Sequence, residues 1–268
     1  MKLTTKKIPD FSEYGSGKPL LFLGGLLQSK EPLGDFVDQA VIRGYKVIRV
    51  GYRGHVCKFG NDFTLDDIIS DIKEVISYLQ VEKVDIFGEA LGGTLALVLA
   101  QQIPEKIGRI AIAGAVCFRD RERHQRFKKW YSTLKTEGID CFIEESLPDI
   151  FSSGWLERNS HKVADIKSLL LADRSSDGMI KLFESAARYR MDISRLSSIK
   201  VPVMVIGGKH DAIARADHSR RLAKKLPLSK YKELESGHAM TKECSDILIG
   251  TIDDFFQNGL KNSNSAFI

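Results

Sequence analysis

The chain has 268 residues, of which 43% are hydrophobic and 28% are charged, and its formal net charge is +5. These values are ordinary for a soluble single-domain protein, and the sequence has no apolar run near the ~20 residues that span a bilayer and no apolar N-terminal signal segment. Because the four cysteines lack metal-site or disulfide spacing and no nucleotide-binding motif occurs, we expect a cytoplasmic protein without a metal or other cofactor.

Predicted strands and helices alternate along most of the chain. Short apolar runs bounded by polar residues predict the strands, and apolar residues on one face predict the helices. The strands are predicted at 2–8, 19–24, 45–51, 83–88, 108–114, 201–207 and 229–235, and the helices at 32–43, 65–80, 91–103, 217–226 and 243–257. This alternation predicts a mostly parallel sheet with helices on both faces.

The segment Gly88-Glu89-Ala90-Leu91-Gly92-Gly93 joins a predicted strand to a predicted helix. It has the G-x-S-x-G-G spacing of a nucleophile elbow, with alanine in place of serine at the apex. Gly88 and Gly92 remove bulk on both sides of the sharp turn, and the apex lies at a helix N-terminus, where partial positive charge stabilises a developing anion. On this segment alone, an ordinary strand-to-helix junction stays open as the alternative.

The alternation stops between about Arg119 and Arg190, where helical patterns predominate. The stretch from Arg119 to Lys135 contains seven basic residues against two acidic ones, which equals the whole net excess. One interpretation is recruitment of an anionic substrate, such as a carboxylate or an acyl group on an acidic carrier protein. The interpretation that we favour is a solvated helix face. Aromatic residues are too sparse here to indicate nucleic-acid binding.

Two polar residues follow predicted strands in the last third of the chain. Asp211 comes after the strand at 201–207, and His238 follows the strand at 229–235. A lone aspartate usually caps a turn, and a lone Gly-His usually lies in a loop. Together with the elbow at position 90, however, they follow the chain order of nucleophile, acid and histidine, which favours a catalytic triad.

The chain resembles the α/β-hydrolase superfamily over most of its length. Residues 14–25 resemble the family's glycine turn, third strand and oxyanion loop, although Gly24-Gly25 stands where His-Gly is common. Arg53-Gly54-His55 resembles the turn after the fourth strand, without the acid that usually precedes it. The resemblance implies an α/β-hydrolase fold with a mostly parallel, eight-stranded sheet flanked by helices. Its expected parts are a core of residues 1–118 and 191–258, a helical lid at 119–190 and a frayed tail at 259–268.

The resemblance also implies roles for particular residues. Asp211 would orient His238, which would take a proton from a serine at position 90 in the cleavage of an ester, lactone or thioester. The expected oxyanion donors are the backbone N–H groups of Leu26 and Leu91. The lid pattern resembles the 3-oxoadipate enol-lactonase branch, which favours a small substrate over a long lipid. The lid residues expected to line the substrate pocket are Trp130, Phe151 and Trp155.

Alanine at position 90 prevents formation of an acyl-enzyme. We favour an engineered Ser→Ala substitution, because Asp211, His238 and the elbow glycines are intact; a natural alanine is the alternative. Two other classes stay open: a naturally non-catalytic binding protein, and a lyase or cofactor-free oxygenase that uses His238 and Asp211 as a general base. The expected partner is a small-molecule acyl substrate, which in one interpretation is anionic or bound to a carrier protein. We expect neither nucleic acid nor a membrane as a partner. The sequence does not indicate the oligomeric state.

Overall fold

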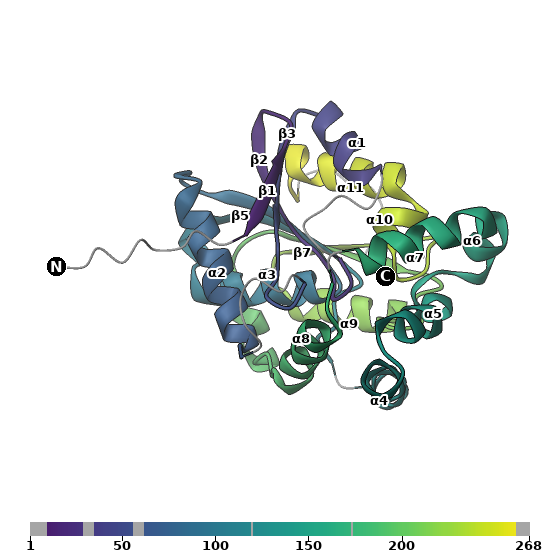
Figure 1. Ribbon diagram of the computed structural model, residues 1–268. Helices are drawn as coiled ribbons and strands as arrows, with labels where there is room; N and C mark the ends of the chain where they lie inside the picture. Colours follow the sequence, from purple (N-terminus) through teal and green to yellow (C-terminus); the bar gives the residue numbers. More distant parts are fainter. Residues whose placement is uncertain (1–9, 29–34, 56–61, 119, 173, 261–268) are drawn as a thin grey trace.

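The computed structural model describes residues 10–28, 35–55, 62–118, 120–172 and 174–260. Its centre is a seven-stranded sheet with the order β1-β3-β2-β4-β5-β6-β7 (Figure 1). All neighbouring strands are parallel except β1, which pairs antiparallel with β3. The strands are β1 Phe11–Tyr14, β2 Lys18–Leu23, β3 Tyr45–Val50, β4 Val84–Glu89, β5 Ile107–Ala113, β6 Val203–Gly208 and β7 Ser229–Leu234.

Helices cover both faces of this sheet. Those of the strand-helix alternation are α1 Phe36–Ile42, α2 Leu65–Tyr78, α3 Leu91–Gln102, α9 Ala216–Lys225, α10 Met240–Glu243 and α11 Ser245–Asn258. Those between β5 and β6 are α4 Arg121–Thr136, α5 Ile139–Ile150, α6 Ser153–Arg158, α7 Val163–Leu171 and α8 Ser176–Arg188. Short 3-10 helices are η2 Pro104–Lys106, η3 Ser160–Lys162 and η4 Ile193–Ser198.

Alternate residues of each strand enter two different apolar cores. In β2, Leu20 and Phe22 pack with α1 and α11, whereas Leu21 and Leu23 face the core that contains α2, α3 and α9. Because successive strand side chains point to opposite faces, a strand buried on both sides must be apolar throughout. This is why the inner strands β2 to β6 appear in the sequence as mostly apolar runs, and the predicted mostly parallel sheet between helices is confirmed.

The structure differs from the predicted elements at the edges. The strand β1 is not among the predicted elements, because its sequence FSEY has no apolar run and is half exposed at the sheet edge. The strand predicted at 2–8 and residues 261–268 of the predicted tail lie outside the described residues. The described residues form seven strands, whereas eight were expected. The helix predicted at 243–257 corresponds to α11, which begins two residues later, and the short helix α10 precedes it.

The helices between β5 and β6 pack on one another through aromatic side chains. Phe127 and Trp130 of α4 lie 5.0 Å apart between ring centroids, and Phe183 of α8 contacts both Phe127 and Phe142 of α5. We call this part, residues 120–190, the helical insertion. Ser185 of α8 connects the helical insertion to the segment before α2, because its hydroxyl donates a hydrogen bond to the carbonyl oxygen of Phe63.

Candidate active site

Ala90 lies at the apex of the turn between β4 and α3. Its backbone has φ 52° and ψ −112°, in a region that non-glycine residues rarely adopt. The N–H of Ala90 donates to the carbonyl oxygen of Ala113 on β5 at 2.8 Å, and the residue is 8% exposed. Strained backbone of this kind persists only where the surrounding structure enforces it, and such positions cluster at functional sites.

The glycines on both sides of the apex are required by close backbone contacts. A Cβ atom on Gly92 would lie 1.9 Å from the carbonyl oxygen of Leu23, and one on Gly88 would lie 2.5 Å from that of Gly92. The backbones of β2, β4 and α3 therefore touch at this point. The elbow glycines allow that approach, which agrees with the steric reason for the motif in the sequence.

We expect Gly92→Ala to lower the free energy of unfolding by about 3 kcal/mol or more, because the added methyl group would overlap backbone that cannot move freely. Gly250→Ala is the matched control: it lies within α11, and an added Cβ there would have nothing within 4 Å. This control should gain up to about 1 kcal/mol from the higher helix propensity of alanine. Urea unfolding measures both variants, and equal stabilities would contradict the steric argument.

Asp211 and His238 form a buried pair at the ends of β6 and β7. The His238 Nδ1–H donates to Asp211 Oδ2 at 2.8 Å. The other carboxylate oxygen accepts from the N–H groups of Ile213 and Ala214 at 2.8 and 2.7 Å. Because the carboxylate can only accept, the proton of a neutral His238 is on Nδ1 and Nε2 is free to act as a base. Nε2 makes no hydrogen bond within the described part of the chain.

The charge around His238 favours its protonated form. Burial lowers the pKa of His238, but the charge and hydrogen bond of Asp211, helped by the charge of Glu89, raise it further than burial lowers it. The net pKa therefore lies above the ordinary histidine value of 6.5. A histidine in this state is a stronger base than one in water.

Gly114 connects the histidine pair to the apex. A Cβ atom on Gly114 would lie 3.1 Å from both Asp211 Oδ2 and His238 Nδ1. Gly114 has φ 58° and directly follows Ala113, which accepts the hydrogen bond from Ala90. The structure thus brings the apex, the acid and the histidine together at the end of β5. Sequence reasoning missed Gly114, although a glycine directly after a predicted strand is a usable signal.

The loop after β2, residues 24–28, lies beside the apex. Its Gly25 lies against residue 90, since a Cβ atom there would lie 3.2 Å from the Ala90 Cβ. Side chains hold three of its carbonyl oxygens. These bonds run from Tyr52 Oη to Gly24 O at 3.0 Å, from His55 Nε2 to Leu26 O at 2.8 Å and from Arg174 Nη2 to Leu27 O at 2.6 Å. The N–H groups of Leu26 and Leu91, which are the expected oxyanion donors, donate no hydrogen bond to any described residue.

A buried hydrogen-bond network lies beneath the apex. The carboxylate of Glu89 is 2% exposed and accepts from Gln28 Nε2 at 2.5 Å and from the N–H and hydroxyl of Thr241 at 3.1 and 2.7 Å. Gln28 Oε1 in turn accepts from the N–H of Gly25 at 2.6 Å. The network joins the 24–28 loop, the elbow and the segment after His238. We did not predict it, although a carboxylate within an apolar strand must find donors when it is buried.

We expect Glu89→Gln to reduce the free energy of unfolding by about 2 kcal/mol, because an amide group cannot accept all the hydrogen bonds that the carboxylate accepts. Glu157→Gln is the control, since Glu157 is exposed on α6. Urea unfolding of both variants tests this role. Equal stability of the Glu89 variant and the native chain would show that the network contributes nothing to the fold.

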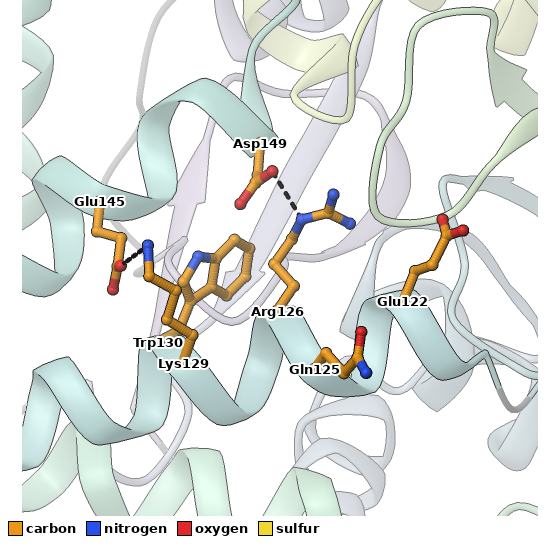
Figure 2. A pocket seen from close by; sticks show the side chains of 7 residues that line it. All are labelled: Glu122, Gln125, Arg126, Lys129, Trp130, Glu145 and Asp149. Carbon is orange, nitrogen blue, oxygen red and sulfur yellow. Dashed lines mark ion pairs between the residues drawn. The ribbon is translucent and has the colours of Figure 1, made fainter.

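The three aromatic residues expected to line the pocket have different surroundings. Phe151 and Trp155 stack with ring centroids 4.5 Å apart, and the neighbouring carbonyl of Ile150 accepts from the N–H of His238 at 2.9 Å. The chain around Phe151 is thus anchored beside the histidine. Trp130 packs between α4 and α5 instead, and it lines a surface pocket of about 470 Å³ (Figure 2). The ring contacts of Trp130 are with Phe127 of α4 and Phe142 of α5.

The basic helix α4 is paired with acidic residues of α5. Arg126 Nε lies 2.7 Å from Asp149 Oδ1, and Lys129 forms an ion pair with Glu145; Figure 2 shows both pairs across the pocket. Arg126 also donates to the carbonyl oxygen of Ala212, next to Asp211. These pairs neutralise two of the positive charges of α4 and connect α4 to α5, which indicates a role for both residues in packing the insertion.

The described residues contain no cluster of three or more histidine, cysteine, aspartate or glutamate side chains arranged to hold a metal ion. Among the same residues, none of the helices combines the length and the apolar character needed to cross a membrane.

Comparisons with known proteins identify related sequences and structures. The profile of the family described as "Serine aminopeptidase, S33" matches residues 18–243. A Rhizobium rhizogenes protein named "Putative carbamate hydrolase RutD" is 24% identical over 208 residues, covering 75% of this chain and 79% of that protein. The pyrrolizixenacetamide deacetylase of Xenorhabdus hominickii is 23% identical over 229 residues, covering 84% and 85%. The enol-lactonase structure from Burkholderia xenovorans LB400 superimposes with a TM-score of 0.82 at 21% identity, over 92% of this chain and 96% of that one, and shows the same α/β-hydrolase fold.

Proposed function

Because the chain belongs to the serine aminopeptidase S33 family of α/β-hydrolases, we propose that its site cleaves a small carboxylic ester, lactone or thioester through an acyl-enzyme when serine occupies position 90. One observation carries this proposal. The hydrogen-bonded pair of Asp211 and His238 packs against Gly114, next to the residue that binds the Ala90 N–H, and the N–H groups of Leu26 and Leu91 donate to no described residue; this arrangement supports a serine-hydrolase site.

The proposed mechanism assigns each group a role. The serine oxygen attacks the substrate carbonyl carbon while His238 Nε2 takes the hydroxyl proton, and Asp211 stabilises the resulting imidazolium. The N–H groups of Leu26 and Leu91 donate to the oxyanion. The tetrahedral intermediate collapses with cleavage of the bond to the leaving group, to which His238 gives the proton. Water then attacks the acyl carbon with His238 as the base, which releases the acid and restores the serine.

In this chain, Ala90 removes the nucleophile and leaves the rest of the site. We propose that the alanine is a substitution of the catalytic serine and that this chain binds its acyl substrate without forming an acyl-enzyme. The strained φ of Ala90 supports this proposal, since a general-base site without a nucleophile does not need that apex conformation. The helical insertion would act as the lid, supported by its contacts with His238 through Ile150 and with Leu27 through Arg174.

A second candidate function is favoured by the alanine itself. If alanine is the natural residue at position 90, His238 would activate a water molecule directly. The N–H groups of Leu26 and Leu91 would then stabilise the oxyanion formed on a carbamate or amide carbonyl. The names of the two sequence relatives, a carbamate hydrolase and a deacetylase, support hydrolysis of such C–N bonds.

One assay separates these functions. The native chain and Ala90→Ser are compared on p-nitrophenyl acetate, a small lactone, an acyl thioester and a carbamate. Turnover by Ala90→Ser alone supports the acyl-enzyme mechanism, and equal turnover by both supports general-base catalysis. Absence of turnover in both, with ligand binding retained, would replace either function by that of a binding protein.

A further inference from the structure

The backbone around His238 is held by the helical insertion. Strand β7 ends at Leu234, before the histidine, so the hydrogen bonds of the sheet do not reach it. The N–H groups of His238 and Ala239 instead donate to the carbonyl oxygen of Ile150, at 2.9 and 3.1 Å. Ile150 is the last residue of α5. The place of the histidine therefore depends on where the insertion lies.

Glu243 adds a side-chain connection between the same two segments. Its Oε1 accepts from the N–H of Ser152 at 2.9 Å, and its Oε2 accepts from the Ser152 hydroxyl at 2.5 Å and from the N–H of Gly237 at 3.0 Å. Hydrogen bonds to a carboxylate are roughly twice as strong as those between neutral groups. One side chain thus holds both the residue directly before His238 and a residue of the insertion.

The backbones of the two segments touch beside this carboxylate. A Cβ atom on Gly237 would lie 2.6 Å from the backbone nitrogen of Ser152, 3.0 Å from the carbonyl carbon of Phe151 and 2.5 Å from Glu243 Oε1. Only glycine permits an approach this close, because any other residue would place its side chain where the insertion backbone lies. The insertion and the segment before His238 are therefore fitted to each other at this point.

Ser152 extends the connection to the aromatic pair of the insertion. Its hydroxyl, which donates to Glu243, also accepts from the N–H of Trp155 at 3.3 Å and so caps the N-terminus of α6. Phe151 directly precedes Ser152, and its ring stacks on that of Trp155. Glu243 therefore holds the turn that places two of the aromatic residues expected to line the substrate pocket.

We propose that Glu243 is a positioning residue, which fixes His238 for proton transfer and ties its place to residues 150–152 of the insertion. This inference rests on the proposed function, in which His238 Nε2 takes the proton of a serine at position 90. Such a transfer requires the base within hydrogen-bond reach, and a displacement of about 1 Å can cost roughly 100-fold in rate. Residues 150–152 are in this arrangement a fixed wall of the site, which stays in place while His238 acts.

The first test uses the native chain and does not need turnover. The Nδ1 proton of His238, which lies in the hydrogen bond to Asp211, is observed by NMR and assigned with His238→Ala. We expect Glu243→Gln to shift or broaden this signal, because an amide has a single accepting oxygen and leaves the N–H of either Gly237 or Ser152 unpaired. A residue that only stabilised the insertion would not change the signal.

Two further variants accompany Glu243→Gln. Glu235→Gln is the matched control and should leave the signal unchanged, because Glu235 is 69% exposed, lies in the segment before His238 and pairs with Lys209. Ser152→Ala is a milder change, which removes the hydroxyl and keeps both backbone donors to Glu243. It should change the signal in the same way but to a smaller extent. Urea unfolding of each variant verifies that the fold is intact.

The second test measures turnover in the Ala90→Ser background. Glu243→Gln should lower kcat for p-nitrophenyl acetate roughly 10- to 100-fold, whereas Glu235→Gln should retain the rate. Ser152→Ala combined with Glu243→Gln should cost less than the product of their separate effects, because both substitutions break the same connection.

Three results would overturn the proposal. In the first, folded Glu243→Gln leaves the proton signal of His238 unchanged; if this variant does not fold, the same criterion applies to Ser152→Ala. In the second, kcat in the Ala90→Ser background is unaffected. In the third, the two substitutions combine as the full product of their effects, which indicates that Glu243 acts without the insertion. Failure of the proposed function is distinct, since it appears as absence of turnover by Ala90→Ser itself and leaves the NMR result intact.

Discussion

Ala90→Ser is expected to raise kcat for p-nitrophenyl acetate by about 10⁶-fold over the native chain, because removal of the nucleophile from a comparable triad costs about that factor. The elbow, the pair of Asp211 with His238 and the free N–H groups are already formed. The substitution adds a single oxygen to a side chain that is 8% exposed, so the fold need not change to accept it.

The covalent intermediate provides a second measurement of the same prediction. Mass spectrometry of Ala90→Ser quenched during turnover should find one acetyl group on the peptide that contains position 90. The matched control is the double variant Ala90→Ser, His238→Ala, in which the hydroxyl has no base and the rate should return to that of the native chain. A rate for Ala90→Ser within tenfold of the native chain, without an acetylated peptide, would rule out the acyl-enzyme mechanism.

Asp211→Asn in the Ala90→Ser background is expected to reduce kcat by about 10⁴-fold, as the equivalent change does in a serine protease. An asparagine amide can donate to His238 Nδ1, which would move the proton to Nε2 and leave no base facing the serine. The substitution also removes the negative charge that stabilises the imidazolium. Asp217→Asn is the control, because Asp217 is exposed at the start of α9 and pairs with Arg215.

The pH profile distinguishes this role from a purely structural one. His238 must be neutral to accept a proton, so kcat/KM falls as the pH drops through its pKa. Asp211 raises that pKa above the ordinary value, so the acidic limb in the Ala90→Ser variant should lie above pH 6.5. Without the carboxylate, burial dominates and the pKa falls, so the limb should move to lower pH in Asp211→Asn. An unchanged limb would contradict the assignment of Asp211.

The amino-acid sequence by itself determined the features that depend on neighbouring residues. Apolar runs located the five inner strands β2 to β6, since a parallel strand buried on both faces has a continuous local signal. The edge strand β7 was also predicted, although its sequence SKYKEL has no such run. The elbow was visible because its glycine spacing is a pattern of six consecutive residues, although the backbone that requires Gly92 belongs to Leu23 of β2. The Asp211 and His238 positions were visible because each follows a predicted strand, and parallel strands deliver such residues to one edge of the sheet.

Only the tertiary structure decided which side chains meet across the chain. Glu89 pairs with Gln28 and Thr241, which are 61 and 152 residues away, and Arg174 reaches Leu27 across 147 residues. Trp130 and Phe151 looked equivalent in the sequence, but packing placed one among the insertion helices and the other beside His238. The physical reason is that a hydrogen bond depends on distances between segments, and no local pattern of residues encodes those distances.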